Sequence, residues 1–341
     1  MFGKKKEKNS SVAIDIGTQN LKIVEIEKSE KSIKLLNFKV LNLVIDGKRY
    51  LPKEISKMLK KALSEMGIST KLVKTSVSGK SLIVRHVELP KMTVAELKSS
   101  LKYQADLHIP YNLDEAYYDA SIVENAKGVP ENKMKALIVA IKKSDAEENL
   151  DILEKAGLDI ELLTVDSIAL FNVFESNIKA NEKEEVIALI DIGSTKTTVN
   201  IVDKGESVLS RELKYGGLKF TEVLMEGLNT NFDDAEKKKI SGNDIILPFV
   251  NEAYKPIIRD IRASFDYFEG MMGISINKLY LSGGGALSRG ITDYFKDKLG
   301  IPCLLWNPLR GIDENAVEDK EGLVKNASSL TISIGTAIST A

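Results

Sequence analysis

The sequence predicts an α/β protein built from two similar halves, because one strand–turn motif occurs twice and a glycine-rich turn follows a third apolar segment. The chain has 341 residues, which suits two domains of about 150 residues each. Segments 12–16 and 188–192 both end in Ile-Asp-Ile followed by glycine, and Asp191 stands 176 residues after Asp15. A third apolar segment, 278–282, runs into three consecutive glycines. The simplest architecture is a duplication in which each half opens with the same β-hairpin.

The composition is that of a globular protein with no unusual charge. Hydrophobic residues make up 43% and charged residues 28%, which excludes wholesale disorder. Forty-eight Lys and Arg balance 49 Asp and Glu, so we expect no nucleic acid among the partners. With one cysteine, Cys303, and two histidines, the chain has neither an internal disulfide nor a credible zinc site. These features fit a cytoplasmic protein.

Neither a membrane span nor a secretory signal is expected. No apolar run approaches the roughly 18–20 residues that cross a bilayer. The start of the chain carries Lys4, Lys5 and Lys6 but lacks the apolar core of a signal peptide. Residues 1–10 are therefore predicted to be a basic, solvated tail.

The two hairpin turns carry residue types that suit a phosphate. Gly17 and Gly193 allow positive φ and a close approach of the backbone to a ligand, and successive turn N–H groups can point at one anion. Side-chain donors follow each glycine. The candidate phosphate-binding residues are Gly17, Thr18, Gln19, Asn20, Lys22, Gly193, Ser194, Thr195 and Lys196.

An aspartate precedes each of these glycines at the end of a predicted buried strand. Such a carboxylate is unfavourable unless it is paired or faces a cation. Asp15 and Asp191 are therefore the candidate metal-binding residues, for Mg²⁺ held through water, because Mg²⁺ keeps several of its waters when it binds to proteins.

The triple glycine Gly283, Gly284 and Gly285 has no Cβ atoms, so a flat base or a ribose could lie against its backbone. A dinucleotide fingerprint is the competing interpretation, but Ser288 stands where its last Gly or Ala should be. The sequence contains no Gly-x-x-x-x-Gly-Lys-[Ser/Thr] and therefore no P-loop.

Together these motifs resemble the nucleotide-binding superfamily of actin, the heat-shock chaperones and the sugar kinases. The resemblance implies a duplicated actin-like (ribonuclease H-like) α/β fold that binds ATP and Mg²⁺ between its halves. Residues 165–170 and 334–337 look like the two connecting elements of that fold. The adenosine-binding residues that the resemblance implies are Glu236, Lys239, Gly283, Gly284, Gly285 and Arg289.

Residues 89–153 read as a small inserted α/β module. Thr93 and Glu96 form a capping-box pattern at the start of a helix, strands are expected at 116–123 and 134–141, and a further helix at 144–156. The start Met-Phe-Gly-Lys-Lys, the chain length and the segment from Leu89 to Tyr111 resemble the PilM family of type IV pilus assembly, which is related to FtsA. In that family such a module replaces an actin subdomain and serves protein contacts.

The expected domains follow from these motifs. After the tail at 1–10 come a first actin-like domain at 11–185, with its module at about 89–153, and a second at 186–329, with a small subdomain at about 216–269. The segment 330–341 returns to the first domain.

Three functions compete. The family resemblance implies a cytoplasmic scaffold, peripherally bound to the inner face of the membrane, whose cleft receives the cytoplasmic N-terminal tail of a PilN-like single-span membrane protein. Other platform proteins, the assembly ATPase and a second copy of the chain are further candidate partners, and a secretion or DNA-uptake machine uses similar parts.

The alternatives are an FtsA-like division adaptor and a small-molecule kinase. FtsA usually ends in a linker and an amphipathic helix, whereas residues 328–334 read as a strand; sugar kinases usually carry larger insertions.

For the nucleotide itself we expect tight Mg-ATP binding with slow or negligible hydrolysis, and a bias of partner binding by nucleotide. Phosphoryl transfer needs positioned phosphates, Mg²⁺ and an oriented water. The sequence offers candidates for the first two requirements, and the catalytic residue is left unassigned.

Overall fold

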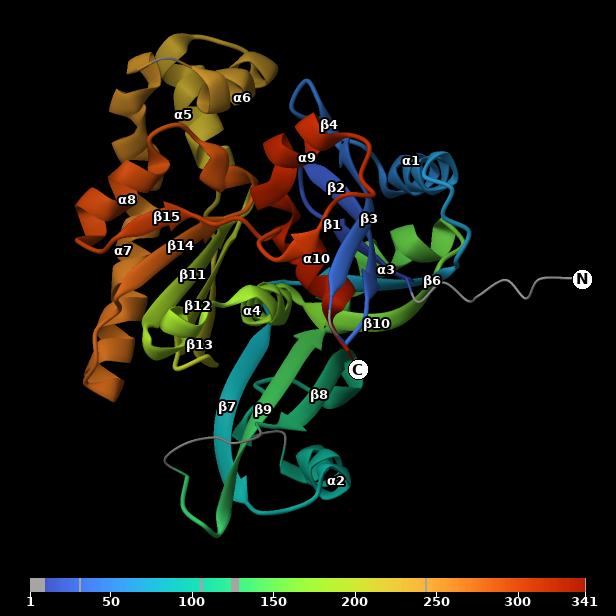
Figure 1. Ribbon diagram of the computed structural model, residues 1–341, viewed down its shortest axis with the longest axis vertical. Helices are drawn as coiled ribbons and strands as arrows, with labels where there is room; N and C mark the ends of the chain where they lie inside the picture. The colour runs from blue at the N-terminus through green and yellow to red at the C-terminus, as the bar shows by residue number, and fades with distance from the viewer. Residues whose placement is uncertain (1–9, 31, 105–106, 124–128, 243, 341) are drawn as a thin grey trace, which may run out of the picture.

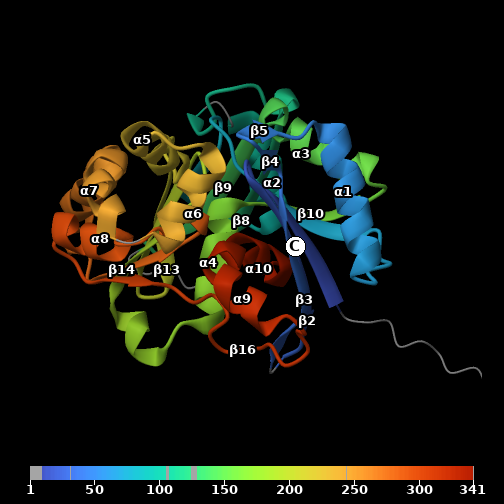
Figure 2. The ribbon, with the colours of Figure 1, turned by 90° about the horizontal axis from the view of Figure 1, so that it is seen from above.

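The computed structural model describes residues 10–30, 32–104, 107–123, 129–242 and 244–340. Two α/β halves lie side by side, and the helices α4 (Asp166–Asn177) and α10 (Thr331–Ile338) run between them (Figures 1 and 2). The predicted basic tail lies outside the described residues except for Ser10.

The first half is built on a six-stranded sheet in the order β10-β6-β1-β2-β3-β16. Alternate residues of β1 face opposite sides, as a pleated strand requires: Ile14 packs with α1 and α3, whereas Ala13 packs with α4 and α10. A small hairpin, β4–β5, follows β3. The elements are β1 (Ser10–Ile16), β2 (Asn20–Lys28), β3 (Ile33–Asn42), β4 (Val44–Ile45), β5 (Lys48–Arg49), α1 (Pro52–Glu65), β6 (Leu72–Val77), α3 (Lys143–Lys155), β10 (Asp159–Val165) and β16 (Ile312–Asp313).

The second half repeats this plan in a five-stranded sheet, β13-β12-β11-β14-β15. In both sheets an antiparallel hairpin, β1–β2 or β11–β12, has a parallel strand beside it, β6 or β14. The duplication predicted from the repeated motif is therefore confirmed. The elements are η3 (Ala180–Glu184), β11 (Val186–Ile192), β12 (Thr197–Asp203), β13 (Glu206–Leu213), α5 (Leu218–Leu228), α6 (Phe232–Ser241), η4 (Asp244–Ile246), α7 (Leu247–Met272), β14 (Lys278–Ser282), η5 (Gly284–Leu287), α8 (Ile291–Leu299), β15 (Cys303–Leu305), α9 (Lys320–Asn326) and η6 (Ala327–Leu330).

The inserted module projects away from both large sheets (Figure 1). Its sheet has the order β7-β9-β8, and α2 covers one face. The predicted capping box is present, since Glu96 Oε2 accepts from the Thr93 backbone N–H at 2.7 Å and Thr93 Oγ1 accepts from the Glu96 N–H at 3.3 Å. The elements are β7 (Ile83–Pro90), α2 (Val94–Gln104), η2 (Leu113–Glu115), β8 (Ala116–Ile122) and β9 (Lys133–Lys142).

The boundaries of this unit differ from the expected 89–153. The sheet begins at Ile83, because β7 pairs with β9 from Ile83↔Ala140 onward. The helix α3 packs through Ile152 and Leu153 into the core of the first half rather than into the module. The module is therefore an excursion between β6 and α3.

The strand expected at 328–334 is wrong: η6 and α10 are helical there. Thr and Ile favour strands only where a pleated, half-buried surface receives them. Here every residue of α10 is buried, and the helix crosses α4 at Gly335. Tertiary packing on all sides therefore overrides the local β preference.

We expect the substitution Gly335→Val to destabilise the fold by about 2 kcal/mol or more, because overpacking a close contact forces the backbone to move. A Cβ at position 335 would lie 1.9 Å from the carbonyl oxygen of Ala169. Urea unfolding measures the change. The matched control is Gly270→Ala in α7, where nothing lies within 4 Å of the added atom; an equal loss in both variants would contradict the close helix crossing.

Candidate functional site

The two hairpin turns face each other across the halves of the molecule. Each turn is closed by the same hydrogen bond, from Gly17 N–H to Asn20 O and from Gly193 N–H to Lys196 O, both 2.9 Å long. The hydroxyl oxygens of Thr18 and Thr195 lie 3.1 Å apart and form a hydrogen bond between the halves. The structure therefore brings together the two groups of predicted phosphate-binding residues.

The reason for glycine in these turns differs from the expected one. Neither Gly17 nor Gly193 has a positive φ. A Cβ would instead crowd the carbonyl oxygen that closes the turn, at 2.9 Å from Asn20 O and 3.1 Å from Lys196 O. Glycine permits the tight turn by close approach.

Asp15 and Asp191 lie at the ends of β1 and β11 and are 8% and 9% exposed. Lys22 Nζ donates to Asp15 Oδ2 at 2.9 Å, and Ser282 Oγ donates to Asp191 Oδ1 at 2.8 Å. Burial raises the pKa of Asp191 to about 6. The Ser282 hydrogen bond and the charge of Lys22 lower this pKa but do not outweigh the effect of burial. Burial lowers the pKa of Lys22, but Asp15 outweighs it and the net shift is upward. Asp191, with only a hydroxyl beside it, is the less well compensated carboxylate.

A third carboxylate of the cleft, Asp166, was not predicted. It begins α4, is buried, and accepts from Lys196 Nζ at 2.7 Å. Burial raises the pKa of Asp166, but the charge and hydrogen bond of Lys196 outweigh it and lower the pKa below its usual value. Lys196, predicted as a phosphate donor, is thus already engaged by a carboxylate. The sequence signal was an acidic residue at the start of the first connecting helix.

The small subdomain is joined directly to the second turn. Gly217 N–H donates to Gly193 O, and Leu218 N–H donates to Ser194 O, both at 2.8 Å. A Cβ at Gly216 would lie 2.4 Å from Ser194 O. The start of α5 is therefore bound directly to the second turn.

Glu236 and Lys239 lie beside this junction. Lys239 is 3% exposed, and its Nζ donates to Glu236 Oε1 at 2.6 Å and to Thr221 Oγ1 at 2.9 Å. Burial lowers the pKa of Lys239, although Glu236 opposes the shift. The Arg289 backbone N–H donates to Lys239 O at 2.9 Å, while the Arg289 guanidinium pairs with Asp244 at 2.6 Å. The predicted adenosine-binding residues of α6 and of the glycine-rich segment are therefore neighbours.

The three glycines of the glycine-rich turn have different roles. Gly283 has φ +87° and lies against Ile192 O, and a Cβ at Gly285 would be 2.4 Å from Ile192 Cγ2. Gly284 alone of the three faces open space. Gly283 and Gly285 thus allow the turn to pack closely against β11, and Gly284 leaves room for a ligand.

The residues of this cleft fit a magnesium-bound nucleotide. Gln19 Nε2 and Ser194 Oγ, in the two turns, are buried and have no hydrogen-bond partner among the described residues. Two carboxylates flank the turns, and no group of three or more acidic, His or Cys ligands occurs in the described part of the chain. That donor set suits Mg²⁺ coordinated largely by water and phosphate.

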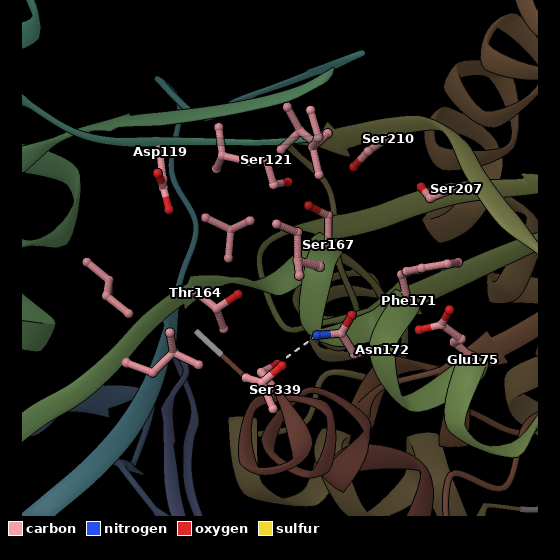
Figure 3. Close-up of a pocket in the computed structure, with 18 of the residues that line it drawn as sticks. Asp119, Ser121, Thr164, Ser167, Phe171, Asn172, Glu175, Ser207, Ser210 and Ser339 are labelled. Carbon is pink, nitrogen blue, oxygen red and sulfur yellow. Dashed lines mark hydrogen bonds between the residues drawn. The ribbon is translucent and has the colours of Figure 1, made fainter. Parts of the chain in front are cut away.

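A second feature is a groove of about 1110 Å³ between the module and both halves (Figure 3). Its lining includes the face of the module sheet opposite α2, represented by Leu137 and Val139, and the side of α4 that carries Phe171. The strands β8 and β10, which also line it, are edge strands of their sheets. Burial, with the charge of Lys135, lowers the pKa of His86 in this lining to about 4, so His86 is neutral at neutral pH. The turn at Gly205–Ser207 closes the groove from the second half.

The duplicated halves, the paired hairpins and the two crossing helices define the actin-like ATPase fold. A solved structure described as "PilM-PilN type IV pilus biogenesis complex" superposes with a TM-score of 0.82 at 23% identity, covering 96% of this chain and 97% of that one. MreB5 of Spiroplasma citri bound to ADP superposes with a TM-score of 0.50 at 15% identity, over 98% and 96% of the two chains.

The family model described as "Type IV pilus assembly protein PilM" matches residues 13–341. The chain belongs to this family. Cell division protein FtsA of Staphylococcus epidermidis (strain RP62A) is 26% identical over 260 residues, which cover 68% of this chain and 54% of that protein. The chain spans about half the length of the curated relatives it matches. Among the described helices, none has the length and apolar character to cross a membrane.

We expect Asp191→Asn to remove a pH dependence of stability in the protein without nucleotide or Mg²⁺. A carboxyl whose pKa rises from about 4 to about 6 on folding stabilises the fold below pH 4, and this stabilisation is lost as the pH rises through 6. Two pKa units correspond to about 3 kcal/mol. Urea unfolding gives the free energy of unfolding of each protein. The value for the variant minus the value for the parent should increase by about that amount between pH 4 and pH 8. Parallel pH profiles would contradict the raised pKa.

Proposed function

We propose that the protein is an actin-like, ATP-binding scaffold of the type IV pilus assembly platform that binds the cytoplasmic tail of a PilN-like membrane protein. Membership of the PilM family and the similarity to a PilM–PilN complex support a role in type IV pilus assembly. The observation that carries the proposal is the shared helix α4, which starts at the nucleotide cleft with Asp166 and lines the groove with Phe171.

The nucleotide is held between the halves. The turn N–H groups after Gly17 and Gly193, with the unpartnered Gln19 and Ser194 side chains, receive the phosphates. Asp15 and Asp191 hold Mg²⁺ through water, and the ion neutralises phosphate charge when bound. Gly284 leaves space for the adenosine, flanked by the α6 residues Glu236 and Lys239 and by Arg289.

Turnover is slow or negligible in this proposal. A general base must be free to orient and deprotonate a water. Of the two further carboxylates near Lys196, Asp166 is bound by it at 2.7 Å and has a lowered pKa, which makes it a weak base. Glu212, whose pKa burial raises to about 7, lines the small pocket beside β7. ATP then serves mainly to join the two halves.

The groove suits an extended peptide. Its walls combine an apolar sheet face with the edges of β8 and β10, and an extended segment can add to such an edge through backbone hydrogen bonds while its side chains fill the pockets. A membrane partner that leaves its N-terminal tail in the groove would hold this protein at the inner face of the membrane.

Nucleotide and peptide are linked by geometry in this proposal. The groove is lined by β10 and the module on the first half and by Gly205–Ser207 on the second. When ATP binds and the two halves close around it, the width of the groove therefore changes. The affinity for ATP and the affinity for the peptide are then coupled reciprocally.

Replacement of Asp191 by Ala should weaken Mg-dependent ATP binding at least tenfold, because one of two metal-facing carboxylates is lost. Titration with a fluorescent ATP analogue, once with Mg²⁺ and once with EDTA, measures this affinity. The variant should bind more weakly than the parent only in the presence of Mg²⁺. Asp203→Ala, at the far end of the same hairpin, is the matched control. Unchanged Mg-ATP binding in the Asp191 variant would show that the nucleotide site lies elsewhere.

Leu137→Arg should abolish binding of the PilN-like tail while ATP binding persists, because an arginine on the sheet face would occupy the groove. Tyr103→Arg is the matched control, since Tyr103 is 87% exposed on α2, the helix that covers the opposite face. Pull-down of the full-length partner from solubilised membranes, with and without Mg-ATP, measures both variants. Retention by Leu137→Arg would exclude this groove, and recovery of a filament-forming division protein instead would favour an FtsA-like role.

A further inference from the structure

The groove has an acidic end between α4 and the β12–β13 turn. Glu175 on α4 and Glu206 on β13 both line it, and they belong to opposite halves of the molecule. Figure 3 shows Glu175 and Ser207 on one side of the pocket and Asp119 on the other. Glu206 is half-buried, so its charge is only partly solvated, whereas Glu175 is exposed.

These two carboxylates differ from the other charged groups of the lining. Asp119 is paired with Lys98 at 2.7 Å, and Lys28 donates to Ile338 O at 2.9 Å. Neither Glu175 nor Glu206 has an ion-pair or hydrogen-bonding partner anywhere in the described ranges. The charge that they place at this end of the groove is therefore uncompensated within the described part of the fold.

A buried hydroxyl in the same lining also lacks a partner. Ser167, in the first turn of α4, is 3% exposed, and its Oγ makes no hydrogen bond to any described residue. It lies at the floor of the groove (Figure 3). Buried polar atoms without partners are rare in folded proteins and mark places where a ligand or a water completes the bonding.

We propose that Glu175 and Glu206 select a cationic side chain, Lys or Arg, adjoining the apolar stretch of the bound segment. This inference rests on the proposed peptide-binding function of the groove. A guanidinium or ammonium beside these carboxylates forms charge-assisted hydrogen bonds, and the apolar lining at Leu137 and Phe171 receives the neighbouring side chains.

Charge complementarity identifies the occupant as the cytoplasmic tail of a membrane protein. Segments next to a membrane span on the cytoplasmic side are enriched in Lys and Arg. The attraction is local, because the small adjoining pocket of about 220 Å³ is lined by four cations, Lys80, Arg85, Arg211 and Lys214, against one acidic residue, Glu212. A bound tail therefore has a preferred direction, with its cation toward α4 and away from that pocket.

The test uses the full-length protein and two fluorescein-labelled peptides in a polarisation titration. One is the cytoplasmic N-terminal tail of the PilN-like protein from the same organism; in the other every Lys and Arg is replaced by Gln. The parent protein should bind the native tail about tenfold more tightly than the Gln tail, as expected for charge-assisted contacts at a partly desolvated site. The double variant Glu175→Gln/Glu206→Gln should bind both peptides with the same affinity.

Asp119→Asn is the matched control, since its carboxylate is already paired; this variant should keep the tenfold preference. Equal affinity of the parent for the two peptides overturns the charge selection and leaves the peptide groove intact. Loss of the preference in Asp119→Asn, with its retention in the double variant, overturns the assignment to Glu175 and Glu206. No binding of the native tail to the parent overturns the proposed function itself.

Discussion

The structure depends on the crossing of α4 and α10 at Gly335. The backbone of α10 lies so close to Ala169 O that any side chain at position 335 would collide with it. Both helices run between the two sheets, and Figure 2 shows them at the centre of the molecule. Because β1 and β11 pack against these helices, the crossing sets how the two aspartate-bearing hairpins face each other. A glycine without catalytic chemistry thereby positions the candidate site.

The second constraint is the burial of three carboxylates in one cleft. Each is compensated differently: Asp15 by an ion pair with Lys22, Asp166 by an ion pair with Lys196, and Asp191 by a hydrogen bond from the Ser282 hydroxyl and the more distant charge of Lys22. Buried charge is unfavourable without a partner, so the pKa of Asp191 rises while that of Asp166 falls. Asp191 is therefore the carboxylate that gains most from a bound cation, and Asp166 is the one least able to act as a base.

The sequence predicted the duplicated halves and the pairing of their turns, because Ile-Asp-Ile-Gly is a local pattern that occurs twice. It could not predict Asp166, whose place in the cleft depends on long-range packing of α4 against Lys196. Residues 334–337 were expected to be the second connecting element, but residues 328–334 were expected to form a strand, because their sequence favours a strand and only burial makes them helical. The groove was foreseen as a cleft beside the module, but its lining from both halves follows from tertiary structure.

The helix α4 is a short, rigid element that contributes to two sites, the candidate nucleotide cleft and the groove. Its first residue is fixed in the candidate cleft by Lys196, and six residues later Asn172 donates a 2.8 Å hydrogen bond to Ser339 at the edge of the groove. The Lys196–Asp166 pair thus ties the second-half turn to the helix that also lines the groove. Since Gly217 and Leu218 donate to that same turn, the proposed nucleotide on the small subdomain and the proposed peptide on α4 would act on the same junction.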